Sequence, residues 1–503
     1  MNRRDFLKLA GLLPLGVSVS KIERLIGHER QLLGKPKNVV VIVFDAFSAY
    51  NISTYGYSRK TTPNIDRLAK RAVVYHNHYA AGSFTSPGTA SLLTGVLPWT
   101  NRAFRSRAEV SKPFVSKSLF HAFPNHYRIS YTHNGWAFIL LKQFEHDIEE
   151  LIPPAQLMLD TSASFMQRHF KDVDIASVSW GQALKLGEEG HAYSLFISQL
   201  YEVFASKKNN DLHKLFPHGL PETSNTGFIL ETAIETLGKR LTEIPQPFLA
   251  YFHFLPPHDP YRTPKEFAGV FRGDSYELIQ KPDDLFVTDD IKDTTRTRRA
   301  YDEFVLYCDQ QFGKLYDQLE SNGLLENTIL VLTSDHGELN ERGISGHMTE
   351  AMYQPLVRVP LMIFEPGRET GANVYEFTSA IDLLPTLAHL DGQPVPDWTE
   401  GVILPPYNLN AISNRSLYAL RAMDNRQLAP LTSASIMMVR ENYKLDYHFG
   451  VPDVPPEGLV RLFDIRSDPE EMVELSRSQP GIAAELLNEL KTTLKDVDQP
   501  YLS

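Results

Sequence analysis

Short runs of apolar, mainly β-branched residues recur along the first 395 residues, and these runs are continuous rather than alternating. The strongest is N-V-V-V-I-V-F-D at 38–45, and similar runs occupy 127–131, 247–253, 327–333 and 359–364. A continuous apolar run of this length is typical of a parallel strand that is buried on both faces of a sheet. We therefore predict that these runs are strands of one buried sheet.

Segments with helical periodicity lie between these strands. They cover 61–74, 228–241, 301–319 and 381–390. Strands that alternate with helices are typical of an α/β fold, in which helices cover both faces of the sheet. The predicted architecture is therefore α/β, with a central, mostly parallel sheet flanked by helices.

The pattern changes beyond residue 395. Segments 439–447 and 459–465 alternate like antiparallel strands, and 478–496 has the periodicity of an amphipathic helix. We expect a main domain over 37–395 and a smaller C-terminal α+β subdomain over 396–503. Within the main domain, 145–245 has helical periodicity in places but no pattern of catalytic residues. We expect this range to be a helical insertion that shapes the mouth of a substrate site.

The N-terminus reads M-N-R-R-D-F-L-K-L-A-G-L-L-P-L-G-V-S-V-S, and Arg3 and Arg4 precede a modest apolar run. This segment, 1–20, resembles a twin-arginine export signal, and 21–36 follows as a polar linker. The other interpretation is a basic amphipathic helix. The run is too short for a stable membrane span. The signal predicts export of the folded protein by the twin-arginine machinery to the periplasm or exterior of a prokaryotic cell.

Composition narrows the classes of function. The chain has 503 residues, 42% hydrophobic and 22% charged, which is typical of a globular protein with two or more cores. A net charge of −11 without a broad basic block argues against nucleic acid as a partner. Cys308 is the single cysteine, so an intrachain disulfide and a cysteine-rich metal site are excluded.

The segment S-F-T-S-P-G-T-A-S-L-L-T-G at 83–95 has the features of a helix start. Ser86 is a suitable N-cap and Pro87 suits the first helical position. Thr85 would then lie just outside the helix N-terminus, where free N–H groups and the helix dipole favour an alkoxide, a phosphate or a sulfate. A threonine there is more often an ordinary cap, so a role as nucleophile depends on partners elsewhere in the chain.

Candidate partners follow two of the predicted strands. Asp45 ends the first strand, and Asp335 and His336 follow the strand at 327–333. Side chains at the carboxyl ends of parallel strands meet at one edge of the sheet. Two carboxylates, an imidazole and the Thr85 hydroxyl form a mixed ligand set for one divalent cation. Such an ion would lower the pKa of the Thr85 hydroxyl and hold its oxygen as a nucleophile. Asp45 alone is equally explained as a turn residue.

Two further histidines are candidates for proton transfer. His258 lies in the proline-rich loop F-L-P-P-H-D-P-Y, and His347 lies in G-I-S-G-H. Either imidazole could donate to an ester oxygen or protonate a leaving group near neutral pH. Each histidine alone is more often a surface or hydrogen-bonded residue. The combination with the metal ligands is what favours a catalytic role.

The motifs together resemble the sulfatase family of the alkaline-phosphatase superfamily, over roughly residues 37–496. The matching segments, in the order of the family, are V-I-V-F-D at 41–45, T-P-N-I-D-R-L-A at 62–69, T-S-P-G-T-A-S-L-L-T-G at 85–95, P-P-H-D-P-Y at 256–261, N-T-I-L-V-L-T-S-D-H-G-E at 327–338, R-V-P-L-M-I at 358–363, I-D-L-L-P-T-L at 381–387 and L-F-D-I-R-S-D-P-E-E at 462–471. The resemblance implies an alkaline-phosphatase-like fold.

The resemblance also implies roles for individual residues. It implies metal ligation by Asp45, Asp335 and His336 and places Thr85 at the nucleophile position. His258 corresponds to a histidine that binds the sulfate or phosphate group. The remaining correspondences concern substrate binding: His347 lies near a substrate-binding lysine or histidine of the family, His133 or Asn134 lies near its G-K-W-H segment, and Thr89 replaces its arginine.

Three positions depart from the family pattern. The family has at the Thr85 position a cysteine or serine that is oxidised to formylglycine. The β-carbon of threonine carries a methyl group and cannot become an aldehyde, so no formylglycine is expected. Thr89 stands four residues later in place of an arginine, and Ala46 stands in place of a second aspartate on the first strand. Calcium is typical of sulfatase relatives, and manganese or zinc is typical of phosphoesterase relatives.

The leading interpretation is a metal-dependent hydrolase of sulfate or phosphate esters with Thr85 as nucleophile. Its substrate would be a small-molecule, glycan or lipid ester, and threonine slightly favours phosphate chemistry. One alternative is a transferase of phosphoethanolamine or phosphoglycerol type that uses the same covalent intermediate. The other is an inactive protein that binds a sulfated or phosphorylated glycan, which the changes at Ala46 and Thr89 favour and the retained ligand residues oppose.

Overall fold

The computed structural model describes residues 36–159, 214–223, 226–288, 291–408 and 415–502, and the single positions 197, 200 and 212. The predicted export signal (1–20) and all of the predicted linker except residue 36 lie outside the described residues. Most of the central part of the range 145–245 also lies outside them. The described residues contain no helix that is long and apolar enough to cross a membrane.

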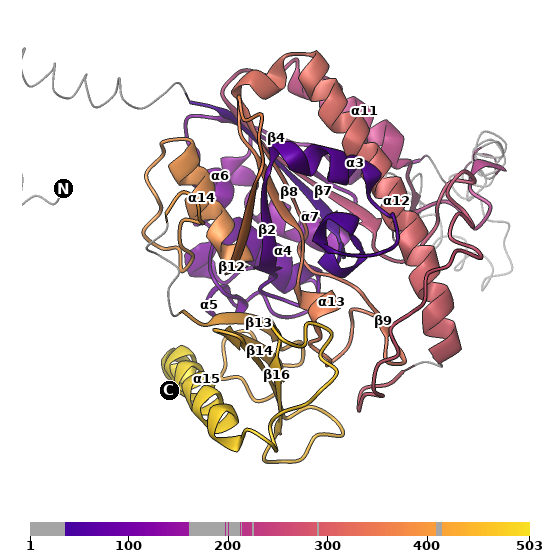
Figure 1. Cartoon of the computed structure of the whole chain (residues 1–503). Coiled ribbons are helices and arrows are strands. Elements are labelled where there is room, and N and C mark those ends of the chain that lie inside the picture. Colours follow the sequence, from indigo (N-terminus) through magenta and orange to yellow (C-terminus); the bar gives the residue numbers. More distant parts are fainter. Residues whose placement is uncertain are drawn as a thin grey trace, which may run out of the picture.

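A central sheet of eight strands organises the main domain, in the order β12-β2-β11-β8-β1-β7-β3-β4. The strands are β1 (Asn38–Asp45), β2 (Val73–Tyr79), β3 (Tyr127–Thr132), β4 (Glu150–Leu151), β7 (Phe248–Pro257), β8 (Thr328–Thr333), β11 (Leu361–Phe364) and β12 (Ala372–Ser379). β11 is antiparallel to both neighbours, and all other neighbouring pairs are parallel. The predicted α/β fold with a mostly parallel sheet is confirmed (Figure 1).

Helices cover both faces of this sheet (Figure 1). The α12 side carries α3 (Pro63–Leu68), α11 (Leu230–Leu241) and α12 (Ile291–Ser321). The α4 side carries α4 (Thr85–Thr94), α6 (Leu119–Ala122), α7 (Gly135–Gln143) and α14 (Leu383–Leu390). The shorter elements of the main domain are α5 (Pro98–Asn101), α13 (Gln354–Val357), β5 (Glu222–Thr223), β6 (Thr226–Gly227), β9 (Leu339–Glu341) and β10 (Ile344–Gly346).

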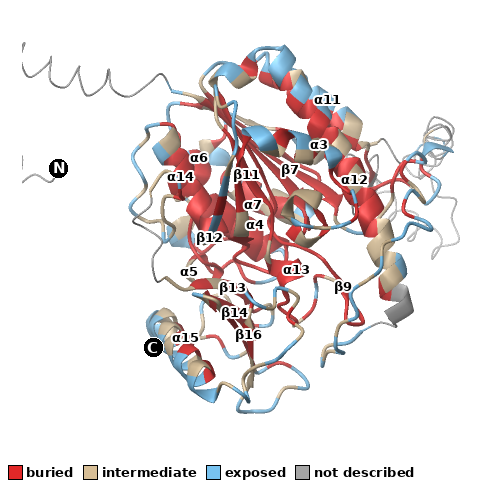
Figure 2. Cartoon of the chain, viewed as in Figure 1, coloured by how far each residue is buried: buried red, intermediate tan, exposed pale blue. Residues whose placement is uncertain are grey.

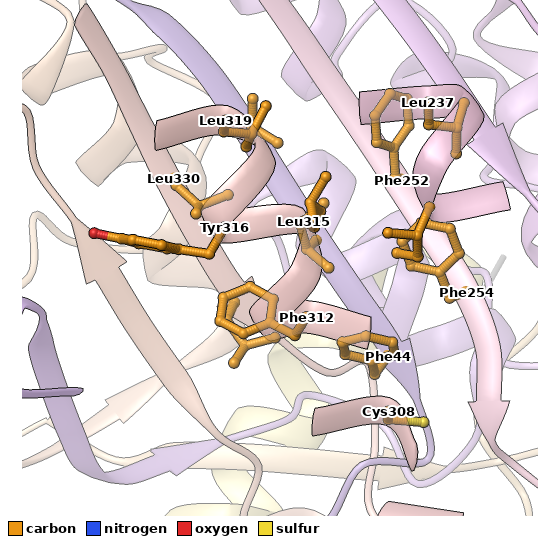
Figure 3. Close-up of a cluster of buried hydrophobic side chains, with 14 of the residues drawn as sticks. Phe44, Leu237, Phe252, Phe254, Cys308, Phe312, Leu315, Tyr316, Leu319 and Leu330 are labelled. Atoms are coloured by element: carbon orange, nitrogen blue, oxygen red, sulfur yellow. The ribbon is translucent and has the colours of Figure 1, made fainter. Parts of the chain in front are cut away.

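Burial on both faces explains the continuous apolar runs. Every residue of β1 and β7 is buried, as Figure 2 shows for the centre of the sheet. Successive side chains alternate between the faces, so Phe44 packs on the α12 side and Val43 on the α4 side. Figure 3 shows the α12-side core, where Phe44 and Phe254 lie near Cys308 of α12. Cys308 is fully buried there as a small apolar residue.

The C-terminal part forms the expected smaller α+β unit. Four antiparallel strands, β13 (Leu417–Arg421), β14 (Ala434–Arg440), β15 (Tyr443–Phe449) and β16 (Leu459–Asp464), carry the amphipathic helix α15 (Pro480–Asp498). A backbone hydrogen bond of 2.9 Å from Leu420 N to Ala81 O joins β13 to the segment before α4. This sheet therefore supports the approach to the helix that begins at Thr85.

Two predicted elements differ in extent from the sequence pattern. The helix predicted over 61–74 ends at Leu68, and Val73 and Val74 instead open β2, because β-branched residues pack well in a buried strand. The strand predicted over 439–447 is a hairpin. Its turn includes Glu441, which has a left-handed backbone (φ 53°) that ends β14.

The range 145–245 differs from the predicted helical insertion at its described ends. β4 pairs in parallel with β3 and forms the edge of the central sheet. α11 packs its apolar face into the same core as α12, and Ile234 and Leu237 are buried there. These ends therefore belong to the layers of the main domain.

The first turn of α4 lies directly against the loop that follows β8. A Cβ atom added at Gly88 would lie 2.2 Å from the backbone oxygen of Asp335. Real Cβ atoms do not approach a carbonyl oxygen so closely, so only glycine allows α4 and this loop to meet at this distance.

We predict that Gly88→Ala lowers the free energy of unfolding by about 1–3 kcal/mol, because the methyl group forces α4 and the loop apart. Urea titration at neutral pH measures this change. Gly135→Ala is the matched control, because a Cβ at Gly135 would meet nothing within 4 Å. Equal stability of the two variants would contradict the prediction.

Candidate active site

Four neighbouring parallel strands, β8, β1, β7 and β3, bring their carboxyl ends to one edge of the sheet. Asp45 is the last residue of β1, and Asp335 lies two residues beyond β8. His253 lies on β7, and Asn134 lies two residues beyond β3. Asp45 and His253 belong to the odd-numbered series of their strands, which faces the α4 side. Segments far apart in the sequence therefore meet below the start of α4.

The turn after β1 is held by hydrogen bonds from two other elements. Ala46 has a left-handed backbone (φ 57°). The Ser334 hydroxyl donates to Phe44 O at 2.6 Å and accepts from Phe47 N at 2.9 Å. The Tyr301 hydroxyl donates to Ala46 O at 2.6 Å. These bonds satisfy the buried backbone groups and fix where the Asp45 side chain leaves the strand.

Two buried carboxylates and two buried imidazoles form the centre of the site. His253 Nε2 lies 3.1 Å from Asp45 Oδ2, and His336 Nε2 lies 3.2 Å from Asp45 Oδ1. Asp335 Oδ2 is 3.8 Å from each of these nitrogens. All four side chains are fully buried. Among the ion pairs of the described residues, both carboxylates pair only with these imidazoles.

The electrostatics of this cluster follow from burial and mutual attraction. Burial raises the pKa of Asp45, but interactions with His253 and His336 outweigh it and lower the pKa well below its usual value. Burial and the charge of Asp45 raise the pKa of Asp335. Burial lowers the pKa of His336, but Asp335 and Asp45 outweigh it and raise the pKa to about 9. The cluster therefore attracts positive charge.

The donor set fits a divalent metal ion. Asp45 Oδ1 and His336 Nε2 are buried and no well-aligned hydrogen bond joins them, although they face one another. His336 Nδ1 donates to Gly337 O at 2.8 Å, so Nε2 faces Asp45 and can bind a cation in exchange for its proton. The ligand atoms of Asp45, His253 and Asp335 lie within 4.8 Å of one another. Carboxylate oxygens and imidazole nitrogens arranged in this way can hold one cation.

Thr85 lies at the edge of this cluster and is 2% exposed. The amide of Asn134 donates to Thr85 Oγ1 at 3.2 Å and also to Asp45 Oδ2. The Asn134 side-chain oxygen accepts from the backbone of Trp136 at 2.7 Å and caps α7. One side chain thus connects the predicted nucleophile, a predicted metal ligand and a helix terminus.

The start of α4 differs in detail from the sequence expectation. The helix begins at Thr85 with Phe84 as N-cap, rather than at Pro87 with Ser86 as N-cap. The Ser86 hydroxyl is buried and has no hydrogen-bond partner among the described residues. Pro87 is compatible with this earlier start, because N–H groups of the first helical turn have no partner within the helix. Thr85 is therefore the first helical residue and remains at the positive end of the dipole.

The three residues predicted to bind substrate lie in different surroundings. Asn134 lines a cavity next to Thr85. Thr89 is buried and donates to Asp335 Oδ2 at 3.2 Å, so it faces the carboxylate cluster. His133 is fully buried and stacks on Phe228 with ring centroids 4.0 Å apart. Neither Thr89 nor His133 is among the described residues that line this cavity.

The cavity has a volume of about 640 Å³ and opens beside the cluster. Thr85, Asn134, His258 and His347 lie in its wall. The rest of the lining mixes apolar and charged side chains and includes Arg107, Trp136, Ile139, Glu222, Leu255, Asp259 and Met348. A polar ester with an organic substituent could therefore contact Thr85.

His258 and His347 form a pair, with ring centroids 4.6 Å apart. Glu338 Oε1 lies 3.1 Å from His347 Nδ1, and the Tyr261 hydroxyl donates to Glu338 Oε2 at 3.0 Å. His258 Nδ1 lies 2.6 Å from Asp259 O. Burial lowers the pKa of His258, but the negative charges of Asp45, Asp259 and Glu338 outweigh it and raise the pKa. With Nδ1 occupied, Nε2 of each ring is the atom that can meet a substrate.

The sequence interpretation assigned no role to His253 or Glu338. His253 ends the run P-F-L-A-Y-F-H just as Asp45 ends its strand, so the same strand-end argument could have identified it. Glu338 is fully buried, and its contact with His347 crosses a loop whose course no local pattern predicts. The ligand atoms of His258, Asp259 and His347 also lie within 4.8 Å of one another, but Asp259 is exposed.

Comparisons with known proteins show the family of this chain. The sulfatase family model matches residues 37–392. The chain is 27% identical to a choline-sulfatase of Rhizobium meliloti over 89% of this chain and 84% of the relative. It is 24% identical to human iduronate 2-sulfatase over 97% of this chain and 87% of that relative. In structure it is similar to a phosphonate monoester hydrolase of Agrobacterium radiobacter, with a TM-score of 0.66, 18% identity and coverage of 92% and 95%.

Fold and family together define an ester hydrolase with an alkaline-phosphatase-like architecture. The chain belongs to the sulfatase family, which confirms the resemblance carried by the motifs. Proteins of this family generally bind a divalent metal ion, and the cluster around Asp45 and Asp335 is a candidate site for that ion.

We predict that His133 makes stability depend on pH. Burial lowers the pKa of His133 to about 3, below the value of about 6.5 in an unfolded chain. The buried neutral form therefore contributes its full stability above about pH 6.5, and this contribution is lost as the pH falls. Between pH 8 and pH 5 the loss is about 2 kcal/mol.

Urea titrations of the wild type and of His133→Phe at both pH values test this. The variant has no titrating group here, so its stability should fall about 2 kcal/mol less than that of the wild type. His389→Phe is the matched control, because it makes the same change of residue type at an exposed position. Identical pH dependence of wild type and His133→Phe would contradict the prediction.

Proposed function

We propose that this protein hydrolyses sulfate or phosphorus esters by direct attack of Thr85. The observation that carries the proposal is the position of Thr85 Oγ1. It lies at the N-terminus of α4, accepts a hydrogen bond from Asn134, and lines the cavity beside two buried carboxylates. We assign the divalent metal ion to Asp45, Thr85, Asp335 and His336. When bound there, the ion would lower the pKa of the hydroxyl and neutralise charge on the transferred group.

The residues support a two-step displacement. The Thr85 hydroxyl loses its proton to water, and Oγ1 forms a bond to phosphorus or sulfur while the bond to the ester oxygen breaks. The departing alcohol takes a proton from Nε2 of His258 or His347, whose Nδ1 atoms are held by other groups. Water then attacks the same atom and gives one proton to the imidazole. The phosphate, phosphonate or sulfate product leaves, and Thr85 Oγ1 takes up a proton from solvent. Asn134 and the helix terminus stabilise the oxygen anion of Thr85 at both stages.

Threonine favours phosphorus as the reacting atom. The formylglycine route of sulfatases needs a cysteine or serine, and the methyl group of Thr85 prevents formation of the aldehyde. The proteins compared above include both sulfur and phosphorus chemistry in their names: two relatives are sulfatases and a structural neighbour is a phosphonate monoester hydrolase. We therefore propose a phosphate or phosphonate ester as the first substrate class to test, with sulfate esters second.

We also propose export by the twin-arginine route to the periplasm or exterior. Arg3 and Arg4 before a short apolar run support this route, which carries folded proteins. A protein that must hold a metal and has a single buried cysteine is suited to folding before export. Replacing both arginines with lysine in the full chain should leave the protein in the cytoplasmic fraction, and continued export would contradict the proposal.

We predict that Thr85→Ala lowers turnover of p-nitrophenyl esters by at least about 10³-fold, because the nucleophile is lost. The measurement compares sulfate, phosphate monoester, phosphate diester and phosphonate monoester with metal-loaded protein. Ser86→Ala is the matched control, because its hydroxyl has no partner within the described part of the chain and should be dispensable.

The outcome of this panel separates the alternatives. Loss of phosphorus-ester turnover in Thr85→Ala, together with one phosphoryl group on the Thr85 peptide of the trapped wild type, supports the proposal. A labelled peptide without hydrolysis in water, but with transfer to an alcohol, indicates the transferase. Undiminished turnover in Thr85→Ala contradicts direct attack.

We predict that His258→Gln and His347→Gln affect esters of poor leaving groups most. Loss of the proton donor should lower turnover of an alkyl ester by about 10²-fold or more. A p-nitrophenyl ester should lose less, because p-nitrophenolate leaves without protonation. His121→Gln serves as control, since His121 is half-exposed, contacts Asp147 and is not among the described residues that line the cavity. If both esters slow equally, these histidines bind the ester group and do not protonate the leaving group.

A further inference from the structure

His253 occupies the space between the two buried carboxylates. Its Nε2 atom lies 3.1 Å from Asp45 Oδ2 and 3.8 Å from Asp335 Oδ2. The ring is fully buried, as are both carboxylates. This one ring nitrogen therefore faces two acids. The position is that of a ligand in the first coordination shell of a cation.

The other ring nitrogen of His253 has a partner that fixes its orientation. The Tyr251 hydroxyl lies 3.3 Å from His253 Nδ1, and Tyr251 is itself fully buried on the same strand face. Metal-bound histidines almost always donate a hydrogen bond from their second ring nitrogen. A hydroxyl can accept as well as donate, so Tyr251 can take this bond from Nδ1–H, and in that tautomer the Nε2 lone pair faces the two acids. His336 has the same arrangement, because its Nδ1 pairs with Gly337 O.

We infer that His253 is a ligand of the divalent ion, and that the site is a two-imidazole centre selective for zinc or a similar transition metal over calcium. This inference rests on the metal-dependent chemistry proposed above. It adds a residue that the motif pattern does not contain, and it assigns the class of metal.

A nitrogen ligand from His253 compensates for the departure at Ala46. A methyl group stands where the family pattern has a second carboxylate on the first strand. His253, on the neighbouring strand, supplies a neutral nitrogen in its place. The resulting set has carboxylate oxygens from Asp45 and Asp335, the Thr85 hydroxyl, and nitrogens from His253 and His336. Two carboxylates balance the charge of one divalent cation.

This donor set determines the metal preference. Calcium takes six to eight oxygen ligands and is rarely bound by imidazole. Zinc and similar first-row ions bind imidazole nitrogen strongly and accept fewer ligands. Two buried imidazoles with only two carboxylates therefore favour a transition metal. In a site that binds calcium through oxygen ligands alone, His253 would remain a buried group that competes with the ion for the Asp45 carboxylate.

Zinc-edge X-ray absorption of the full chain tests the inference. The protein is stripped of metal and loaded with one equivalent of Zn²⁺, and outer-shell scattering counts the bound imidazoles. We expect two in the wild type, one in His253→Asn and two in His133→Phe. His133 is the matched control, because it is also a buried histidine of this region but contacts Phe228 rather than the carboxylates.

Metal affinities give a second readout. His253→Asn should weaken Zn²⁺ binding by at least about 10²-fold and change Ca²⁺ binding by less than about 10-fold, because a nitrogen ligand is lost. The selectivity for zinc over calcium should therefore fall by at least about 10-fold. An unchanged ratio overturns the inference, even if both affinities decrease together.

Zinc could also bind at His258 and His347, so these two are replaced together with glutamine in a further variant. Two imidazoles in this variant place the ion at the buried cluster, with His253 and His336 as its ligands. This count tests the inference even if His253→Asn does not fold. One imidazole in the wild type, or two in folded His253→Asn, overturns the inference.

The test separates this inference from the proposed function. Two imidazoles without turnover of any ester leave the metal assignment intact and contradict the proposed chemistry. Turnover that depends on Thr85 and calcium, with a single bound imidazole, supports the proposed chemistry and contradicts the metal assignment.

Discussion

Two carboxylates buried at the ends of neighbouring parallel strands are the constraint on which the site depends. Asp45 and Asp335 have no exposed surface, and among the described residues their ion-pair partners are imidazoles. Burying two like charges is costly unless positive charge and hydrogen bonds compensate. The surrounding elements supply both: imidazoles from β7 and the loop after β8, a hydroxyl from α4, and an amide from the start of α7.

The fold positions these groups through backbone contacts. Burial on both faces fixes β1, β7 and β8 side by side, so their carboxyl ends stay in register. Ser334 and Tyr301 then hold the turn after Asp45, and Gly88 lets α4 approach Asp335 closely enough for Thr89 to donate to it. The resulting site has a closed half, which suits a metal, and an open half with His258 and His347, which suits an ester.

The sequence determined the architecture and many of the candidate residues. Continuous apolar runs predict buried strands because burial on both faces needs apolar side chains at every position, and the strands at 38–45, 127–131, 247–253, 327–333 and 359–364 are present. Because the carboxyl ends of parallel strands meet at one edge, the sequence pattern is sufficient to group Asp45, Asp335 and His336. Motif order, which is a property of the sequence alone, indicates the family.

Only the tertiary structure decided which side chains touch. Thr89 and His133 follow motif positions linked to substrate, yet one donates to Asp335 and the other stacks on Phe228, because helix and strand faces turn them inward. Val73 belongs to a strand and not to the predicted helix, because it pairs with β11 and β12. Local propensity does not include such pairing between distant segments. The place of His253 between two carboxylates depends on strand order and register. Contacts between distant segments such as these arise from packing. The sequence pattern describes only neighbours along the chain, so it does not contain them.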